Sequence, residues 1–132
     1  MRLPRALIAC ALLGAACAAR EEAPDTVVRA FARAVVDHDE DRAWALLSSD
    51  TRQWLDARAQ AVAAAAPGVI APSGAQLLLG NAARSSRPPK NVVVVRESRD
   101  RAVVEVEEES GVKRRVELVR EQGWRVRIPP PH

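Results

Sequence analysis

The spacing of apolar residues along this chain changes once, at Asn91. From Pro24 up to that region, apolar residues recur every three or four positions, as they do in helices that pack through one face. From Asn91 onward they alternate with polar residues, as in strands with one buried face. This order predicts an α+β domain in which helices pack on one face of an antiparallel sheet.

The N-terminal part is expected to form three helices. The first begins at Pro24, with Asp25 or Thr26 as its cap, and ends at the acidic break 37–41. A short second helix follows over about residues 40–47. The residues expected to be buried in these two helices are Val27, Phe31, Ala34, Val35, Ala43, Leu46 and Leu47.

The third helix is expected to begin at a Ser49 or Asp50 cap and to end at about residue 66, before Pro67. Residues 67–90 carry weaker signals: a short helix could follow Ser73, and the prolines near its end indicate a loop. One broad face of the third helix should carry Trp54, Leu55, Val62 and Ala65.

Four β-rich runs make up the C-terminal part, separated by short links. Such links join only antiparallel neighbours, so the runs predict a four-stranded meander. In the last run Trp124, Val126 and Ile128 should face the core, whereas Arg125 and Arg127 should face solvent.

The register between the second and third runs is expected to pair Val106 with Val116. Glu107 then lies opposite Arg115, which is a favourable cross-strand pair. Large side chains are scarce in this chain, so the aromatic residues should anchor the core: Phe31, Trp44, Trp54 and Trp124.

The stretch PDTVVRAFARAVVDHDEDRAWALLSSDTRQWL, residues 24–55, combines an apolar first helix, an acidic break, a short helix and the start of a third. The last strand places Trp124 directly after the turn residue Gly123. In these features the chain resembles the small lipoprotein members of the nuclear-transport-factor-2-like proteins over residues 24–128. The resemblance implies a cone-like domain of three helices packed on a curved sheet, and it brings no catalytic motif with it.

Residues 1–16 consist of the basic start MRLPR and a short apolar run. This is the layout of a secretory signal, and the run is far shorter than the ~20 apolar residues of a membrane-spanning helix. Cys17 follows directly after Ala15 and Ala16. The segment resembles a bacterial lipoprotein signal, although Gly14 stands where those signals usually carry Leu.

The lipoprotein resemblance implies that cleavage precedes Cys17 and that its thiol carries a diacylglycerol, with residues 17–23 as a polar tether. The protein would then be held at a membrane of the bacterial cell envelope, facing the periplasm or the exterior. Cleavage around Ala16 or Ala18 would instead release a soluble protein. Once Cys10 has left with the signal, the mature chain can form no internal disulfide and no cysteine-based metal site.

A basic sequence pI of about 9.5 raises the question of nucleic-acid binding. Arg2 and Arg5 belong to the signal, and without them the chain has only one more basic than acidic residue. Acids and bases are interspersed, and no basic patch with interleaved aromatic residues is present. The sequence therefore argues against a nucleic-acid partner.

Asp37, His38 and Asp39 form a cluster that could support acid–base catalysis. Consecutive residues at a helix end point in different directions, so this adjacency does not make a catalytic pair. A structural role explains the same residues: His38 near the C-terminal dipole of the first helix, and Asp39 or Asp41 as cap of the second. His132, behind three prolines, is the other histidine, and no metal-ligand or cofactor-binding spacing is present.

Two functions remain open from the sequence. The first is a non-catalytic, lipid-anchored envelope protein that binds a protein partner or a small apolar ligand, or has a structural role. The second is a small isomerase, dehydratase or hydrolase that uses His38 and a nearby carboxylate. A filled space between helices and sheet favours the first, and a deep pocket holding His38 and an acid favours the second.

A third possibility is an electrostatic binding module. It requires one continuous exposed patch formed by the hairpin face from Glu107 to Arg115 together with Arg125 and Arg127. Charged runs of this kind more often form the solvated face of a hairpin. Residues 129–132, PPPH, are expected to be an exposed tail.

Overall fold

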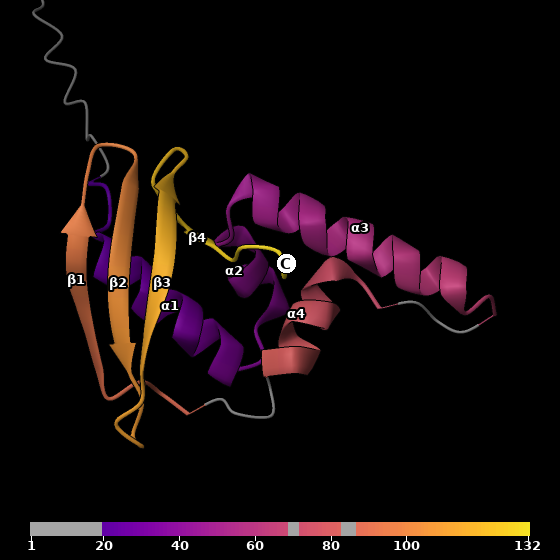
Figure 1. Cartoon of the computed structure of the whole chain (residues 1–132), viewed down its shortest axis with the longest axis horizontal. Coiled ribbons are helices and arrows are strands. Elements are labelled where there is room, and N and C mark those ends of the chain that lie inside the picture. The colour runs from indigo at the N-terminus through magenta and orange to yellow at the C-terminus, as the bar shows by residue number, and fades with distance from the viewer. Residues whose placement is uncertain (1–19, 69–71, 83–86) are drawn as a thin grey trace, which may run out of the picture.

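The computed structural model describes residues 20–68, 72–82 and 87–132. Within these residues the helices precede the strands, which confirms the predicted α+β class (Figure 1). The elements in chain order are α1 (Pro24–Val36), α2 (Glu40–Ala45), α3 (Ser49–Ala65), α4 (Gly74–Ala82), β1 (Asn91–Glu97), β2 (Arg101–Glu107), β3 (Lys113–Arg120) and β4 (Trp124–Arg127). The described chain thus has four helices, one more than the three N-terminal helices expected, because the stretch after Ser73 is helical. None of the described helices is long and apolar enough to cross a membrane.

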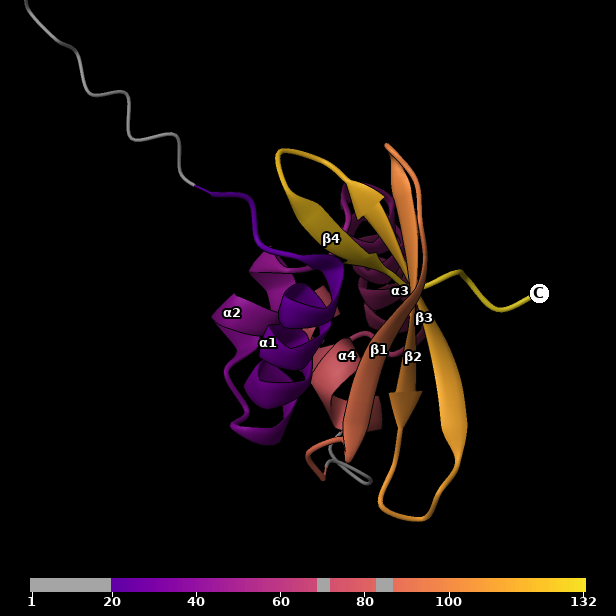
Figure 2. The same cartoon turned by 90° about the vertical axis from the view of Figure 1, so that its left-hand side faces the viewer.

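The four strands form one antiparallel sheet in the order β1-β2-β3-β4, which is the predicted meander. The helices pack against one face of this sheet, with α1 in contact with β1, β2 and β4 (Figure 2). None of the described helices covers the other face, and the C-terminal tail leaves the domain on that side. We call this face, which carries Val103, Glu117 and Arg127, the bare face.

The predicted register between β2 and β3 is wrong by two residues. Val116 lies opposite Val104 instead of Val106, and Arg115 lies opposite Glu105 instead of Glu107. The turn is centred on Ser110, one residue earlier than the predicted register requires: Glu108 N–H donates to the carbonyl of Val112 at 2.9 Å, and Gly111 adopts a φ of +84°. A shift of two residues leaves each side chain on its predicted face.

The core lies between the helices and the sheet. The largest fully buried apolar side chains come from the segment after α2 and from the strands: Leu47, Val104, Leu118, Trp124 and Val126. Trp124 is 2% exposed, as expected of a core anchor, and the other predicted anchors pack around this cluster with part of their surface exposed: Phe31, Trp44 and Trp54.

The C-terminal half of α3 departs from the expected burial. Leu55 is buried, but Val62 is 39% exposed and Ala65 is also exposed. The reason is visible in Figure 1, where the C-terminal half of α3 extends beyond the sheet and past α4. The apolar face of this helix is therefore buried at Leu55 and Ala59 but not at Val62 and Ala65.

Two of the three predicted helix caps are wrong. The N-cap position of α1 is Ala23, without a side-chain hydrogen bond, and Pro24 fills the first helical position, where an N–H is not needed. Ser48, and not Ser49 or Asp50, is the residue that precedes α3. Asp39 caps α2 as expected, since its Oδ1 accepts a hydrogen bond from Arg42 N–H at 3.1 Å.

The second helix ends at Ala45, two residues before the expected end. The segment that follows it pairs with β4 in a parallel bridge between Leu47 and Val126. Val126 N–H donates to the carbonyl of Leu46, and Ser48 N–H donates to the carbonyl of Val126, both at 2.8 Å. A contact with a distant strand therefore takes these residues out of the helix.

Candidate functional site

The cluster Asp37-His38-Asp39 lies in the turn between α1 and α2. His38 is exposed, with a φ of +54°. The carboxylates on either side of it are engaged elsewhere, since Asp37 pairs with Arg33 at 3.0 Å and Asp39 caps α2. The structure therefore does not bring the three side chains together around a common point.

The space between the helices and the sheet is filled by side chains. Leu47, Val104 and Leu118 are each 0% exposed in this layer, and Val126 is 1% exposed. Interiors packed in this way leave little room for a ligand between the layers. A binding site among the described residues therefore has to lie on the outside of the domain.

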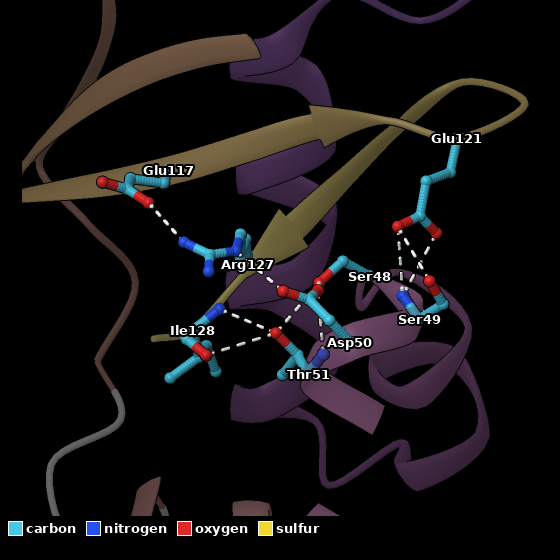
Figure 3. A network of polar contacts seen from close by, with 8 residues as sticks. All are labelled: Ser48, Ser49, Asp50, Thr51, Glu117, Glu121, Arg127 and Ile128. Carbon is cyan, nitrogen blue, oxygen red and sulfur yellow. Dashed lines mark hydrogen bonds and ion pairs between the residues drawn. The ribbon is translucent and has the colours of Figure 1, made fainter. Parts of the chain in front are cut away.

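A network of polar contacts joins the start of α3 to β3 and β4 (Figure 3). Arg127 is at its centre: its Nε donates to Asp50 at 2.8 Å and its Nη1 donates to Glu117 at 3.1 Å. Asp50 also accepts hydrogen bonds from the hydroxyl of Ser48 and from Thr51 N–H. The arrangement fastens helix and sheet to each other through charge-assisted hydrogen bonds.

The charges in this network are stabilised by their neighbours. The hydrogen bond from Ser48 lowers the pKa of the Asp50 carboxyl, with further lowering from Arg127 and Thr51, whereas partial burial acts in the opposite direction. Hydrogen bonds to Asp50 and Glu117 raise the pKa of Arg127. Both groups are therefore charged at neutral pH, which suits a structural clamp better than a proton donor.

The clamp is completed by Thr51, which is 1% exposed. Its hydroxyl oxygen accepts a hydrogen bond from Ile128 N–H at 2.9 Å. This contact fixes the start of the C-terminal tail at Ile128, one residue after the end of β4. The tail then forms one wall of a groove.

The groove has a volume of about 470 Å³ and lies on the bare face of the sheet. Strand pairing places Val103, Glu117 and Arg127 side by side there. A bulge between Val94 and Arg96 adds side chains from β1. The complete lining is Val95, Arg96, Val103, Arg115, Val116, Glu117, Arg127, Ile128 and Pro129.

Cations dominate the charge of this groove. Arg127 is neutralised by its two carboxylate partners. Arg96 and Arg115, in contrast, take part in none of the ion pairs formed among the described residues. With exposed Val95 beside them, they make the groove suited to a ligand that is both acidic and apolar.

Sequence reasoning pointed to part of this surface. Arg115 and Arg127 were expected on an exposed charged face, and both lie on the bare face. The predicted pair of Glu107 with Arg115 is not formed, because Glu107 lies opposite Lys113. Arg96 was missed, since nothing in the run NVVVVRES indicates a bulge.

Among residues 20–68, 72–82 and 87–132, no group of His, Cys, Asp and Glu side chains could hold a metal ion. Comparison of the chain with protein-family models, with curated proteins and with solved structures finds no match.

Proposed function

We propose that this chain is an exported, lipid-anchored protein of the bacterial cell envelope whose domain is a non-catalytic binding module. The observation that carries the proposal is the position of the groove. It lies on the bare face of the sheet, whereas the layer between helices and sheet is filled by residues such as Leu118 and Val126. A surface groove of this kind suits recognition of a partner. The same filled layer is compatible with the proposed kinship to nuclear-transport-factor-2-like lipoproteins.

The anchoring half of the proposal rests on the signal-like start of the sequence, because Cys17 lies outside the described residues. The first described residues lie against the sheet. Glu21 Oε1 contacts Arg120 Nε at 3.1 Å, and the Arg120 guanidinium lies 4.5 Å from the centre of the Trp124 ring. Glu21, in the described part of the tether, therefore lies against the β3–β4 hairpin.

The docked tether would keep the domain near the membrane. Glu21 follows Cys17 by four positions, and each residue spans at most about 3.5 Å when extended. The Cα atom of Cys17 would thus lie within about 14 Å of the Cα atom of Glu21. Under this proposal the end of the sheet that carries the β3–β4 turn is the end closest to the lipid surface.

The alternative, a small isomerase, dehydratase or hydrolase, has less support. It needs His38 and a carboxylate to face a common pocket, yet His38 is exposed in the α1–α2 turn and does not line the groove. Its left-handed backbone conformation is explained by its position in the turn, and no chemical role is needed to account for it. The filled layer therefore favours the binding module over the enzyme.

Mass spectrometry of the membrane fraction tests the anchor. In cells that produce the full chain, we expect an N-terminus that begins at Cys17 and carries acyl chains. Cys17→Ala should abolish the modification, whereas the matched control Cys10→Ala should leave it intact. An unmodified chain that begins near residue 19 in all three samples would show that the protein is secreted without a lipid.

A further inference from the structure

One edge of β3 is paired along only part of its length. On one side β2 pairs with β3 from Lys113 to Val119. On the other side β4 pairs with it only from Glu117 to Arg120. In the part of the chain that the structure describes, residues 113–116 thus have no strand partner on the β4 side. An unpaired strand edge offers backbone N–H and C=O groups to an incoming chain.

Prolines keep this edge open. Continuing the β3–β4 register beyond Arg127 would bring Pro129 opposite Arg115. Proline has no N–H to donate to a strand ladder, and the N–H of Ile128 is already bound to Thr51. The tail therefore leaves the sheet at this point, as Figure 2 shows, and forms a wall of the groove instead of a further pair with β3.

The pairing of β2 with the opposite edge of β3 shows which side chains are compatible with this strand. The β2 sequence VVEVE alternates valine with glutamate, and it places Val104 opposite Val116 and Glu105 opposite Arg115. Glu105 also contacts Lys113 Nζ at 3.6 Å. Apolar and opposite-charge pairs across a ladder both stabilise a sheet. A strand with the same alternation of apolar and acidic residues, added at the open edge, would lie beside the same β3 side chains, Arg115 and Val116.

Two other occupants fit this edge less well. A second copy of the chain using the same edge would set the sequence KRR, residues 113–115, against itself, and like charges across a ladder are destabilising. A lipid headgroup could be attracted by Arg96 and Arg115, but it has no peptide groups to pair with the strand edge. Peptide pairing and charge together favour an acidic polypeptide.

We propose that the open edge of β3 and the adjoining groove bind an extended acidic segment of another envelope protein, which adds to the sheet as a further strand. Carboxylates of the segment lie beside Arg115 and, where the segment continues into the groove, face Arg96. Its apolar side chains pack against Val116 and Ile128. This inference rests on the binding role proposed above and names the class of partner.

Titration of the isotope-labelled protein with a synthetic peptide tests the inference by nuclear magnetic resonance. The probe has the sequence of residues 101–109, RAVVEVEEE, which is the chemistry that β3 already accepts. We expect saturable shifts of the backbone amides of residues 113–116, and slower hydrogen exchange at the alternate residues whose N–H groups point to the open edge. A peptide with lysine in place of each glutamate should not bind, and neither should the acidic peptide methylated on alternate backbone nitrogens.

Variants distinguish binding at the open edge of β3 from nonspecific attraction between opposite charges. Arg115→Glu should weaken binding of the acidic peptide by about tenfold or more, because it opposes the peptide carboxylates. Arg115→Gln should weaken it less, and it avoids repulsion of Glu105 within the sheet. Arg125→Glu is the matched control: Arg125 lies on the bare face but outside the groove, so affinity should stay within about twofold of the unmodified protein. Thermal unfolding of each variant shows that it is folded.

Equal binding of the acidic and lysine peptides, or of the methylated peptide, would overturn the inference, as would an absence of saturable shifts. Binding to anionic vesicles that is lost in Arg115→Glu, without peptide binding, would assign the surface to the membrane instead. None of these results depends on acylation of Cys17. Failure of the inference is therefore distinguishable from failure of the proposed anchor.

Discussion

Glu121 in the β3–β4 turn caps a helix that begins 72 residues earlier in the chain. Its Oε2 accepts a hydrogen bond from Ser49 N–H at 3.1 Å, and its Oε1 accepts one from the Ser49 hydroxyl at 3.0 Å (Figure 3). Ser48 occupies the N-cap position of α3 without capping it by its own side chain. A carboxylate at a helix N-terminus binds free N–H groups and also interacts favourably with the helix dipole.

We expect Glu121→Ala to lower the free energy of unfolding by about 1 kcal/mol, which is the typical cost of losing a helix cap. Chemical denaturation of purified protein measures this. Glu109→Ala is a suitable control, because Glu109 is an exposed glutamate of the β2–β3 turn and forms no ion pair within the described chain. Equal stability of the two variants would show that Glu121 does not act as a cap.

The two glycines of α4 should respond in opposite ways to alanine. A Cβ on Gly74 would lie 2.8 Å from the Trp44 ring and 2.7 Å from an Asp56 oxygen, so Gly74→Ala should cost about 1–3 kcal/mol through overpacking. A Cβ on Gly80 would meet no atom within 4 Å. Gly80→Ala should therefore stabilise the helix by up to about 1 kcal/mol. Thermal melting of both variants checks the contrast, and a gain in stability for Gly74→Ala would contradict it.

Asp50 should make stability depend on pH in the acidic range. The pKa of its carboxyl is lowered in the folded protein, chiefly by the Ser48 hydrogen bond, so its contribution is present above the unfolded pKa of about 3.9. That contribution is lost as the pH falls through the folded pKa. At pH 7 we expect Asp50→Asn to be less stable by up to about 1 kcal/mol, because the pair with Arg127 is largely exposed.

The difference between Asp50→Asn and the unmodified protein should shrink as the pH is lowered below about 4. Urea denaturation across pH 2.5–7 measures it, with Asp41→Asn as a control on an exposed carboxylate. A difference that stays constant over this range would mean that ionisation of Asp50 does not contribute to stability.

His38 should behave as a turn residue. Its φ of +54° is a conformation that Asn adopts more readily than most side chains and that β-branched residues resist. We expect His38→Asn to match or slightly exceed the stability of the unmodified protein, and His38→Val to lose about 1 kcal/mol or more. Binding of the acidic peptide should be the same for both. Instability of His38→Asn would show that the imidazole makes a contact of its own.

The periodicity of the sequence was sufficient to predict the class of fold and the face on which most side chains lie. Trp124 and Val126 are buried and Arg125 and Arg127 lie on the bare face, as their alternation indicates. The cap at Asp39 was also predictable, because its hydrogen bond closes over three residues. Such features depend on neighbours within one or two turns, and local patterns therefore reveal them.

The candidate site was less predictable. Arg115 and Arg127 were expected on an exposed face, but the groove needs the bulge beside Arg96 and the tail held at Ile128. A bulge and a tail position both result from pairing between distant segments. Neither has a local signal in the sequence that could have identified it.

The sequence by itself determined the order of helices and strands, the alternation of buried and exposed positions and the prolines that stop β4. Tertiary structure decided the register of β2 against β3, the cap that Glu121 provides for α3 and the open edge beside Arg115. The physical reason is range. Periodicity reports on a residue and its nearest turns, whereas register, distant caps and unpaired edges depend on how closed loops bring remote residues together.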